Sequence, residues 1–72
     1  MSLFGARLRE LRRNTGVSQK ELANHIGVTE RALRFYETGD REPTIDQLIA
    51  LAQYFQVSLD YLVGRSDEPE RR

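Results

Sequence analysis

The sequence predicts an all-α fold, a compact domain of five short helices. Its 72 residues suffice for one domain, and a composition of 39% hydrophobic and 31% charged residues is typical of a folded, soluble chain. Apolar residues recur at spacings of three and four along most of the chain, which is the period of an α-helix. Serine or threonine precedes four of these stretches at the position of a helix cap. No segment shows the sustained polar–apolar alternation that predicts a strand.

The first three helices are expected at about 3–14, 18–25 and 29–37. Ser18 stands at the cap of the second helix, and Glu21 completes a capping box three residues later. Thr29 stands at the cap of the third. The apolar stripes of these helices contain Phe4, Leu8 and Leu11, then Leu22, Ala23 and Ile26, then Ala32, Leu33 and Tyr36.

The last two helices are expected at about 44–55 and 58–63, with Thr44 and Ser58 as their caps. Their stripes contain Leu48, Ile49, Leu51, Ala52 and Phe55, then Leu59, Leu62 and Val63. Glycines stand where helices stop or the chain turns, at Gly16, Gly27, Gly39 and Gly64. The sequence therefore predicts a domain over 1–64 and a polar C-terminal tail, or the start of a linker, over 65–72.

Composition excludes several classes of function. The chain has no cysteine and one histidine, so neither a disulfide framework nor a metal site is expected. His25 lacks an evident acid partner or nucleophile, so no catalytic residues, cofactor or small-molecule ligand are expected. No apolar run is long enough to span a membrane and no signal peptide is visible, which predicts a cytoplasmic protein without a membrane partner.

The charges are unevenly distributed along the chain. Net charge is zero, which taken alone argues against a nucleic-acid partner. Residues 1–41 hold eight basic and five acidic groups, whereas residues 42–72 hold three basic and six acidic groups. One face can therefore meet an anionic partner while another faces solvent or a second subunit, although a mixed solvated surface explains the same distribution.

The second and third helices are separated by only about three residues around Gly27. A short glycine-containing turn between two capped helices is typical of a helix-turn-helix. In that arrangement the first helix lies over the sugar-phosphate backbone and the second enters the major groove of DNA.

Motifs along residues 4–64 resemble the lambda-repressor-like helix-turn-helix family, also called the Xre/Cro family. The resemblance is carried by Leu8-Arg9-Glu10-Leu11-Arg12, Gly16-Val17-Ser18-Gln19-Lys20-Glu21-Leu22-Ala23, Ile26-Gly27-Val28-Thr29, Tyr36-Glu37-Thr38-Gly39, Arg41-Glu42-Pro43-Thr44 and Val57-Ser58-Leu59-Asp60-Tyr61-Leu62-Val63-Gly64. It implies a five-helix domain that binds double-stranded DNA, as a transcriptional regulator of the repressor kind. It also implies a homodimer on a two-fold symmetric operator.

The resemblance assigns DNA contacts to particular positions. Those facing base edges are Glu30, Arg31 and Phe35, and those contacting phosphates are Gln19, Thr29, Arg34 and Arg41. Arg31 is the expected direct reader, because arginine can donate two hydrogen bonds to guanine O6 and N7. Without the motif, a solvated surface arginine would be the preferred interpretation.

Two of the base-facing positions have alternative explanations. Glu30 can accept a hydrogen bond from cytosine, but an acid also stabilises a helix N-terminus and can hold Arg34 four residues later. Phe35 can pack on a thymine methyl group or belong to the core. Helical periodicity favours an exposed Phe35, because Leu33 and Tyr36 already define the buried stripe.

Other family positions have structural roles. Arg12 and Glu37 match a buried ion pair between the first and third helices, so neither is counted as a DNA contact. The fifth helix is more apolar than a short helix needs for its own core. Its apolar residues either face a partner subunit or close the core, and Tyr61 is the expected exposed group. The candidates for a dimer interface are Leu59, Tyr61 and Val63.

The sequence thus predicts a DNA-binding regulator, and an enzyme is not expected. The alternative is a protein-interaction module on the same fold, such as an antitoxin-like or adaptor protein. Neutral net charge, Glu30 and Phe35 support the alternative, whereas the polar and basic ring of Gln19, Arg31, Arg34 and Arg41 favours DNA.

Overall fold

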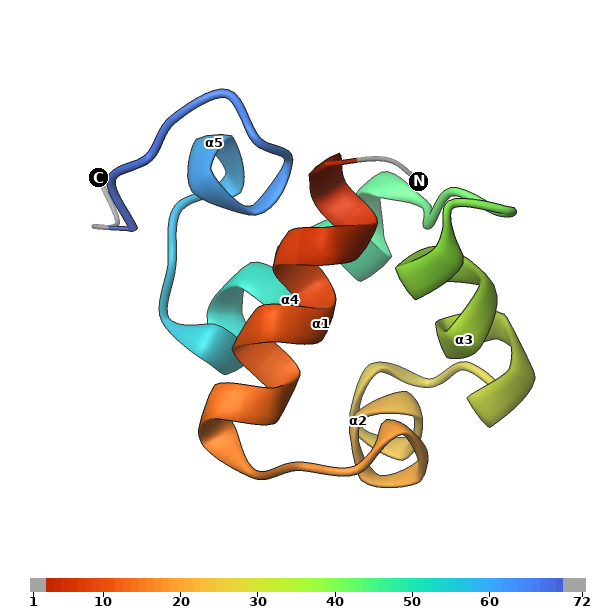
Figure 1. Ribbon diagram of the computed structural model, residues 1–72. Coiled ribbons are helices and arrows are strands. Elements are labelled where there is room, and N and C mark those ends of the chain that lie inside the picture. Colours follow the sequence, from red (N-terminus) through yellow and green to blue (C-terminus); the bar gives the residue numbers. More distant parts are fainter. Residues whose placement is uncertain (1–2, 70–72) are drawn as a thin grey trace.

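The computed structural model describes residues 3–69 and contains no strand in that range. Its helices are α1 (Leu3–Thr15), α2 (Gln19–Ile26), α3 (Glu30–Thr38), α4 (Ile45–Phe55) and α5 (Leu59–Leu62). In Figure 1, α1 crosses the middle of the molecule in front of α4, with α2 and α3 on one side and α5 on the other. The all-α prediction is confirmed. Expected and observed helix boundaries differ by at most one residue, mainly because the expected ranges included the caps.

Four helices begin where the sequence places a cap. Ser18, Thr29, Thr44 and Ser58 are all N-caps with extended backbone, and each side chain accepts the N–H of the residue three positions later. The capping box at Ser18 is complete, because its own N–H donates to Glu21 Oε1 over 3.3 Å. An N-cap of this kind contributes about 1 kcal/mol and satisfies a donor that the helix leaves unpaired. The starts of these helices are therefore determined locally.

Glycines mark the ends of some helices but not of all. Gly27 and Gly39 adopt the left-handed conformation as the C-caps of α2 and α3. At the end of α4 the same conformation is adopted by Gln56, with φ of 57°. This conformation costs a non-glycine residue about 1–2 kcal/mol, and the N–H of Gln56 donates to carbonyls of the last turn of α4. Sequence patterns contain no signal for this turn.

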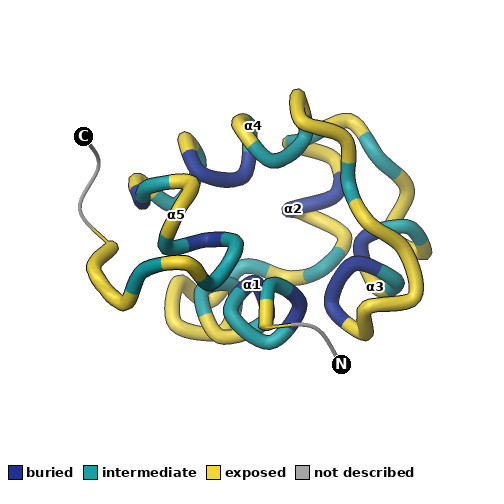
Figure 2. The backbone as a smooth tube through the Cα atoms, turned by 90° about the horizontal axis from the view of Figure 1, so that it is seen from above, coloured by how far each residue is buried: buried dark blue, intermediate teal, exposed yellow. Residues whose placement is uncertain are grey.

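The core contains one fully buried leucine from each helix. Leu8, Leu22, Leu33, Leu51 and Leu62 all have no exposed surface. Figure 2 shows buried stretches on every helix and exposed stretches along the outside of the molecule. Burying a leucine side chain contributes roughly 1.5–3 kcal/mol, so this layer is a major source of stability. The core is completed by Ala23, Tyr36, Ala52 and Val57.

Helix α1 approaches the end of α3 at Gly5, which is buried. A Cβ atom at this position would collide with the carbonyl oxygens of Glu37 and Tyr36. Only glycine therefore allows α1 to lie this close to α3. The close approach brings the basic side of α1 against Glu37.

The described part of the expected tail, residues 65–69, folds back onto the helices. Arg7 donates to the carbonyl oxygen of Ser66 over 2.7 Å and to that of Tyr61 over 2.8 Å. The backbone N–H of Ser58 donates to the carbonyl of Pro69 over 3.0 Å. This stretch therefore extends the packing of α5 on α1. The remainder of the expected tail, 70–72, and residues 1–2 of the expected domain lie outside the described residues.

Candidate nucleic-acid interface

Helices α2 and α3 pack against each other and are joined by three residues, 27–29. The N–H of Val28 donates to the carbonyl of Ala23 over 3.0 Å, which closes the turn after the left-handed Gly27. Thr29 then caps α3. The turn expected around Gly27 is confirmed, and α2 and α3 form the helix-turn-helix.

Helix α3 has one buried and one solvent-facing side. Leu33, Tyr36 and Glu37 are buried, whereas Arg31 and Arg34 are exposed. Glu30, at the first turn, is exposed as well and lies 4.0 Å from the guanidinium of Arg34. This is the expected i, i+4 pair, with both side chains about half exposed. An exposed pair of this kind contributes only a few tenths of a kcal/mol, so both groups can exchange it for another partner.

Phe35 is half-buried, so the expectation of an exposed phenylalanine is wrong. The ring is flanked by two guanidinium groups, with Arg31 Cζ 5.4 Å and Arg41 Cζ 5.3 Å from its centroid. Arg31 is one turn earlier on α3, and Arg41 comes from the loop that follows α3. That loop folds back beside the ring, which periodicity within one helix cannot predict. Phe35 lies outside the core cluster of Leu33 and Tyr36.

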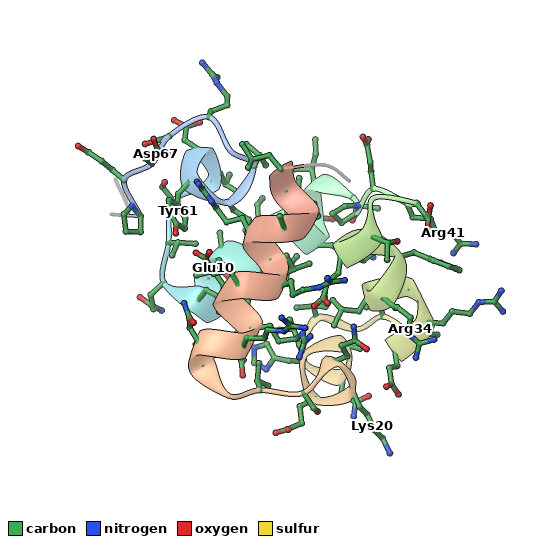
Figure 3. All side chains as sticks on the ribbon, in the orientation of Figure 1. Glu10, Lys20, Arg34, Arg41, Tyr61 and Asp67 are labelled. Atoms are coloured by element: carbon green, nitrogen blue, oxygen red, sulfur yellow. The ribbon has the colours of Figure 1, made fainter. Side chains whose placement is uncertain are left out.

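Basic side chains project from the α2–α3 side of the molecule. Figure 3 shows Lys20, Arg34 and Arg41 on this side, with Tyr61 and Asp67 at the opposite end. Within residues 3–69, Arg31 and Arg41 form no ion pair with a carboxylate. This side of the molecule therefore presents several cations beside α3, two of which have no carboxylate partner in that range.

A buried carboxylate lies beneath this side. Glu37 has no exposed surface, and Arg12 donates to its two oxygens over 2.6 Å and 3.3 Å. The ion pair expected between Arg12 and Glu37 is thus present. The side-chain amide of Gln19 also donates to Glu37 Oε1 over 3.0 Å, and Arg9 Nε lies 3.6 Å from this oxygen. Sequence reasoning missed Arg9, although it stands three residues before Arg12 and so shares its helix face.

The dimer-interface candidates differ in exposure. Leu59 is 44% exposed, whereas Tyr61 and Val63 are half-buried. The expectation that Tyr61 is the exposed group is wrong, because the guanidinium of Arg7 covers its ring at 4.1 Å. The apolar residue that stands out instead is Ile45, which is 75% exposed. Its signal in the sequence is its place directly after the cap, outside the apolar stripe of α4.

Val63 lines a hollow of about 350 Å³ between the start of α1 and the loop before α4. The other lining residues are Leu3, Phe4, Gly39, Arg41, Glu42, Pro43 and Leu48.

Neither a metal site nor a membrane-spanning helix is found in the described part of the chain. Among residues 3–69, no cluster of histidine and carboxylate side chains has the composition to hold a metal ion. In the same range, no helix combines the length and apolar character needed to cross a membrane.

A solved structure shares this arrangement, and curated proteins share much of the sequence. The P22 c2 repressor, solved in complex with a synthetic operator, superposes with a TM-score of 0.84 at 32% identity, covering 92% of this chain and 100% of that one. The regulator ImmR of Bacillus subtilis is 40% identical over 93% of this chain and 52% of its own length. The phage CTXphi repressor RstR of Vibrio cholerae is 32% identical over 90% of this chain and 59% of its own.

The chain spans about half to three fifths of the length of the curated relatives it matches. The family model described as helix-turn-helix matches residues 8–62, which includes most of α1 and all of α2 to α5. The chain therefore belongs to the lambda-repressor-like helix-turn-helix family.

Proposed function

We propose that this chain is a sequence-specific double-stranded DNA-binding transcriptional regulator of the repressor kind, which reads the major groove with α3 and acts in the cytoplasm. The observation that carries the proposal is the exposed side of α3, where Arg31 has no carboxylate partner among residues 3–69. Relatives named as transcriptional regulators and a neighbour solved on an operator support it.

Several polar groups on this side have a chemical role on DNA. Arg31 donates two hydrogen bonds to guanine O6 and N7, and Glu30 accepts from cytosine N4. Arg34 and Arg41 meet phosphates on either side of the groove, which positions the protein without reading sequence. At the start of α2, the side-chain amide of Gln19 and the unpaired N–H groups of the helix attract a further phosphate. Thr29 binds a phosphate at the groove entrance, beside the start of α3.

The proposal includes a homodimer on a two-fold symmetric operator. Apolar side chains stay exposed on α1, α4 and α5 and not on α3, and they are Leu3, Ile45, Ile49 and Leu59. Leu59 is also among the sequence candidates for a dimer interface, so we place the partner subunit against α5. A dimer places two copies of α3 about one helical turn of DNA apart.

The test is selection of bound duplexes from a randomised DNA library at moderate salt. We expect a two-fold symmetric motif with half-sites about one helical turn apart. An isolated half-site would contradict the dimer but would agree with sequence-specific DNA binding. No retention of DNA, even at low salt, would contradict DNA binding and favour a protein partner.

The matched variants are Arg31→Ala and Arg65→Ala. Both residues are exposed, but Arg65 lies beyond α5 at the opposite end from α3. We expect the first variant to lose enrichment of the motif and the second to retain it.

A further inference from the structure

We infer that Phe35 is a positioning residue, whose ring holds the guanidinium groups of Arg31 and Arg41 in place, and that it is not a base contact. This inference rests on the proposed DNA-binding function and deepens it. A single side chain then determines the position of both the base-reading arginine of α3 and the phosphate-binding arginine of the following loop. The affinity contributions of these two arginines become linked through Phe35.

The geometry around the ring carries the inference. Arg31 Cζ and Arg41 Cζ lie 5.4 Å and 5.3 Å from the ring centroid, both within the range of a cation–π interaction. Arg31 is four residues before Phe35 on α3, so the two side chains lie on the same helix face. Arg41 arrives from the loop that follows the helix. The half-buried ring is therefore accounted for by two cations from two different segments.

The backbone of Phe35 reinforces the same link. Its carbonyl oxygen accepts the N–H groups of Gly39, Asp40 and Arg41, over 3.0, 3.0 and 3.3 Å. The hydroxyl oxygen of Thr38 lies 3.1 Å from the same oxygen and 2.8 Å from Asp40 Oδ2, and its single proton is shared between these two acceptors. The start of the loop is thus anchored on Phe35 before Arg41 reaches the ring. Both ends of Arg41, its backbone and its guanidinium, are placed by this one residue.

An aromatic ring orients an arginine without occupying its donors in a salt bridge. Arg12 shows the contrast, because Glu37 and the carbonyl of Val17 take up its N–H groups. The guanidinium groups of Arg31 and Arg41 have no such acceptor among residues 3–69. Their N–H groups stay available for guanine and phosphate.

Holding the two arginines before DNA arrives reduces the entropy lost on binding. A long side chain that is ordered only in the complex weakens binding by the freedom it gives up. Each exposed cation–π contact changes a population by roughly two- to fivefold. We therefore expect the loss of the ring to weaken DNA binding by roughly that factor through each arginine.

The test compares Phe35→Leu with the wild-type chain on the operator obtained by selection. Leucine keeps an apolar side chain but removes the ring, whereas Phe35→Tyr keeps the ring and should rescue binding. Phe4→Leu is the matched control, because Phe4 is half-buried on α1 and its ring has no cation–π contact with an arginine of residues 3–69. Unfolding curves for each variant confirm that all measurements are made on folded protein.

Two double-mutant cycles give the decisive readout. Phe35→Leu is combined with Arg31→Ala in one cycle and with Arg41→Ala in the other, and dissociation constants are measured for all variants. We expect Phe35→Leu to cost roughly two- to fivefold less in each arginine-free background than in the wild-type chain. Equal costs in all backgrounds would overturn the inference.

Uracil in place of thymine distinguishes positioning from methyl contact. We expect each such substitution in the operator to affect wild type and Phe35→Leu equally, because the ring does not touch a base. A loss that is seen in wild type and vanishes in Phe35→Leu would identify Phe35 as a reader of the thymine methyl group and overturn the inference.

A readout without DNA separates failure of the inference from failure of the proposed function. Ring currents of Phe35 should shift the side-chain proton resonances of Arg31 and Arg41 in the free protein. We expect Phe35→Leu to remove these shifts and Phe4→Leu to leave them. Unchanged resonances would overturn the inference even if the wild-type chain binds DNA, and removed shifts would support the geometry even if it does not.

Discussion

The side-chain amide of Gln19 donates to Glu37 Oε1 over 3.0 Å, so the first residue of α2 is tied to a fully buried carboxylate on α3. An amide has two N–H donors, and this bond uses one of them. The proposed phosphate contact is assigned to the second. Glu37 thereby orients a proposed phosphate contact while it pairs with Arg12 on α1.

Removing the charge of Glu37 should strongly destabilise the fold. Glu37→Gln leaves Arg12 and Arg9 without a carboxylate in a largely buried site, and we expect the free energy of unfolding to fall by about 3–5 kcal/mol. Glu42→Gln is the control, because Glu42 is exposed in the loop after α3 and the change should stay within about 0.5 kcal/mol. Urea unfolding measures both, and equal values would contradict a structural role for the ion pair.

Gln19→Ala should weaken DNA binding on every sequence by a similar factor. The variant removes a phosphate contact, which positions the protein without reading bases. Because glutamine carries no charge, we expect the dependence of affinity on salt concentration to keep its wild-type slope. Titrations of the selected operator and an unrelated duplex at several salt concentrations measure both quantities. A change in base preference would show that Gln19 reads sequence.

Arg31 and Arg41 should lose different properties when replaced by alanine. Arg31→Ala is expected to relax preference at one base pair, at a cost of about 1–3 kcal/mol on the preferred base. Arg41→Ala is expected to weaken all duplexes similarly and to lower the salt slope by about 1. Binding titrations against operator variants, with Arg65→Ala as control, provide the comparison. Equal losses on all sequences from both variants would refute this division of roles.

Gly5→Ala should destabilise the chain even though alanine is the better helix former. The new Cβ meets the carbonyl oxygens of Glu37 and Tyr36, so α1 must move away from α3 at a cost of about 1–3 kcal/mol. Glu10→Ala on the exposed side of the same helix should change stability by less than about 0.5 kcal/mol. Thermal and urea unfolding measure the difference, and a stabilised Gly5→Ala would show that α1 and α3 can separate freely.

Much of the interface follows from local pattern. The caps Ser18 and Thr29 mark the starts of α2 and α3, and the turn at Gly27 follows from its left-handed conformation. Exposure of Arg31 and Arg34 follows from the spacing of the apolar residues on α3. The ion pair between Arg12 and Glu37 is predicted by the family resemblance, but the contacts of Glu37 with Gln19 and Arg9 are not.

The environments of aromatic residues could not be predicted in this way. Phe35 and Tyr61 were both expected to be exposed, and each is instead half-buried beside an arginine from another segment, Arg41 for Phe35 and Arg7 for Tyr61. Arg7 reaches Tyr61 across 54 positions of sequence. Contacts of this kind depend on how helices cross and where loops return, which leaves no trace in the period of one helix.

The sequence by itself determined where α2 to α5 begin and that α2 and α3 form a helix-turn-helix. These features depend on hydrogen bonds and spacings within a few residues, so neighbouring positions are enough to specify them. Only the tertiary structure decided that the loop brings Arg41 back beside Phe35, and that Glu37 also engages Gln19 and Arg9. Those contacts join different elements, so they depend on how the elements pack and not on the spacing of residues within one helix.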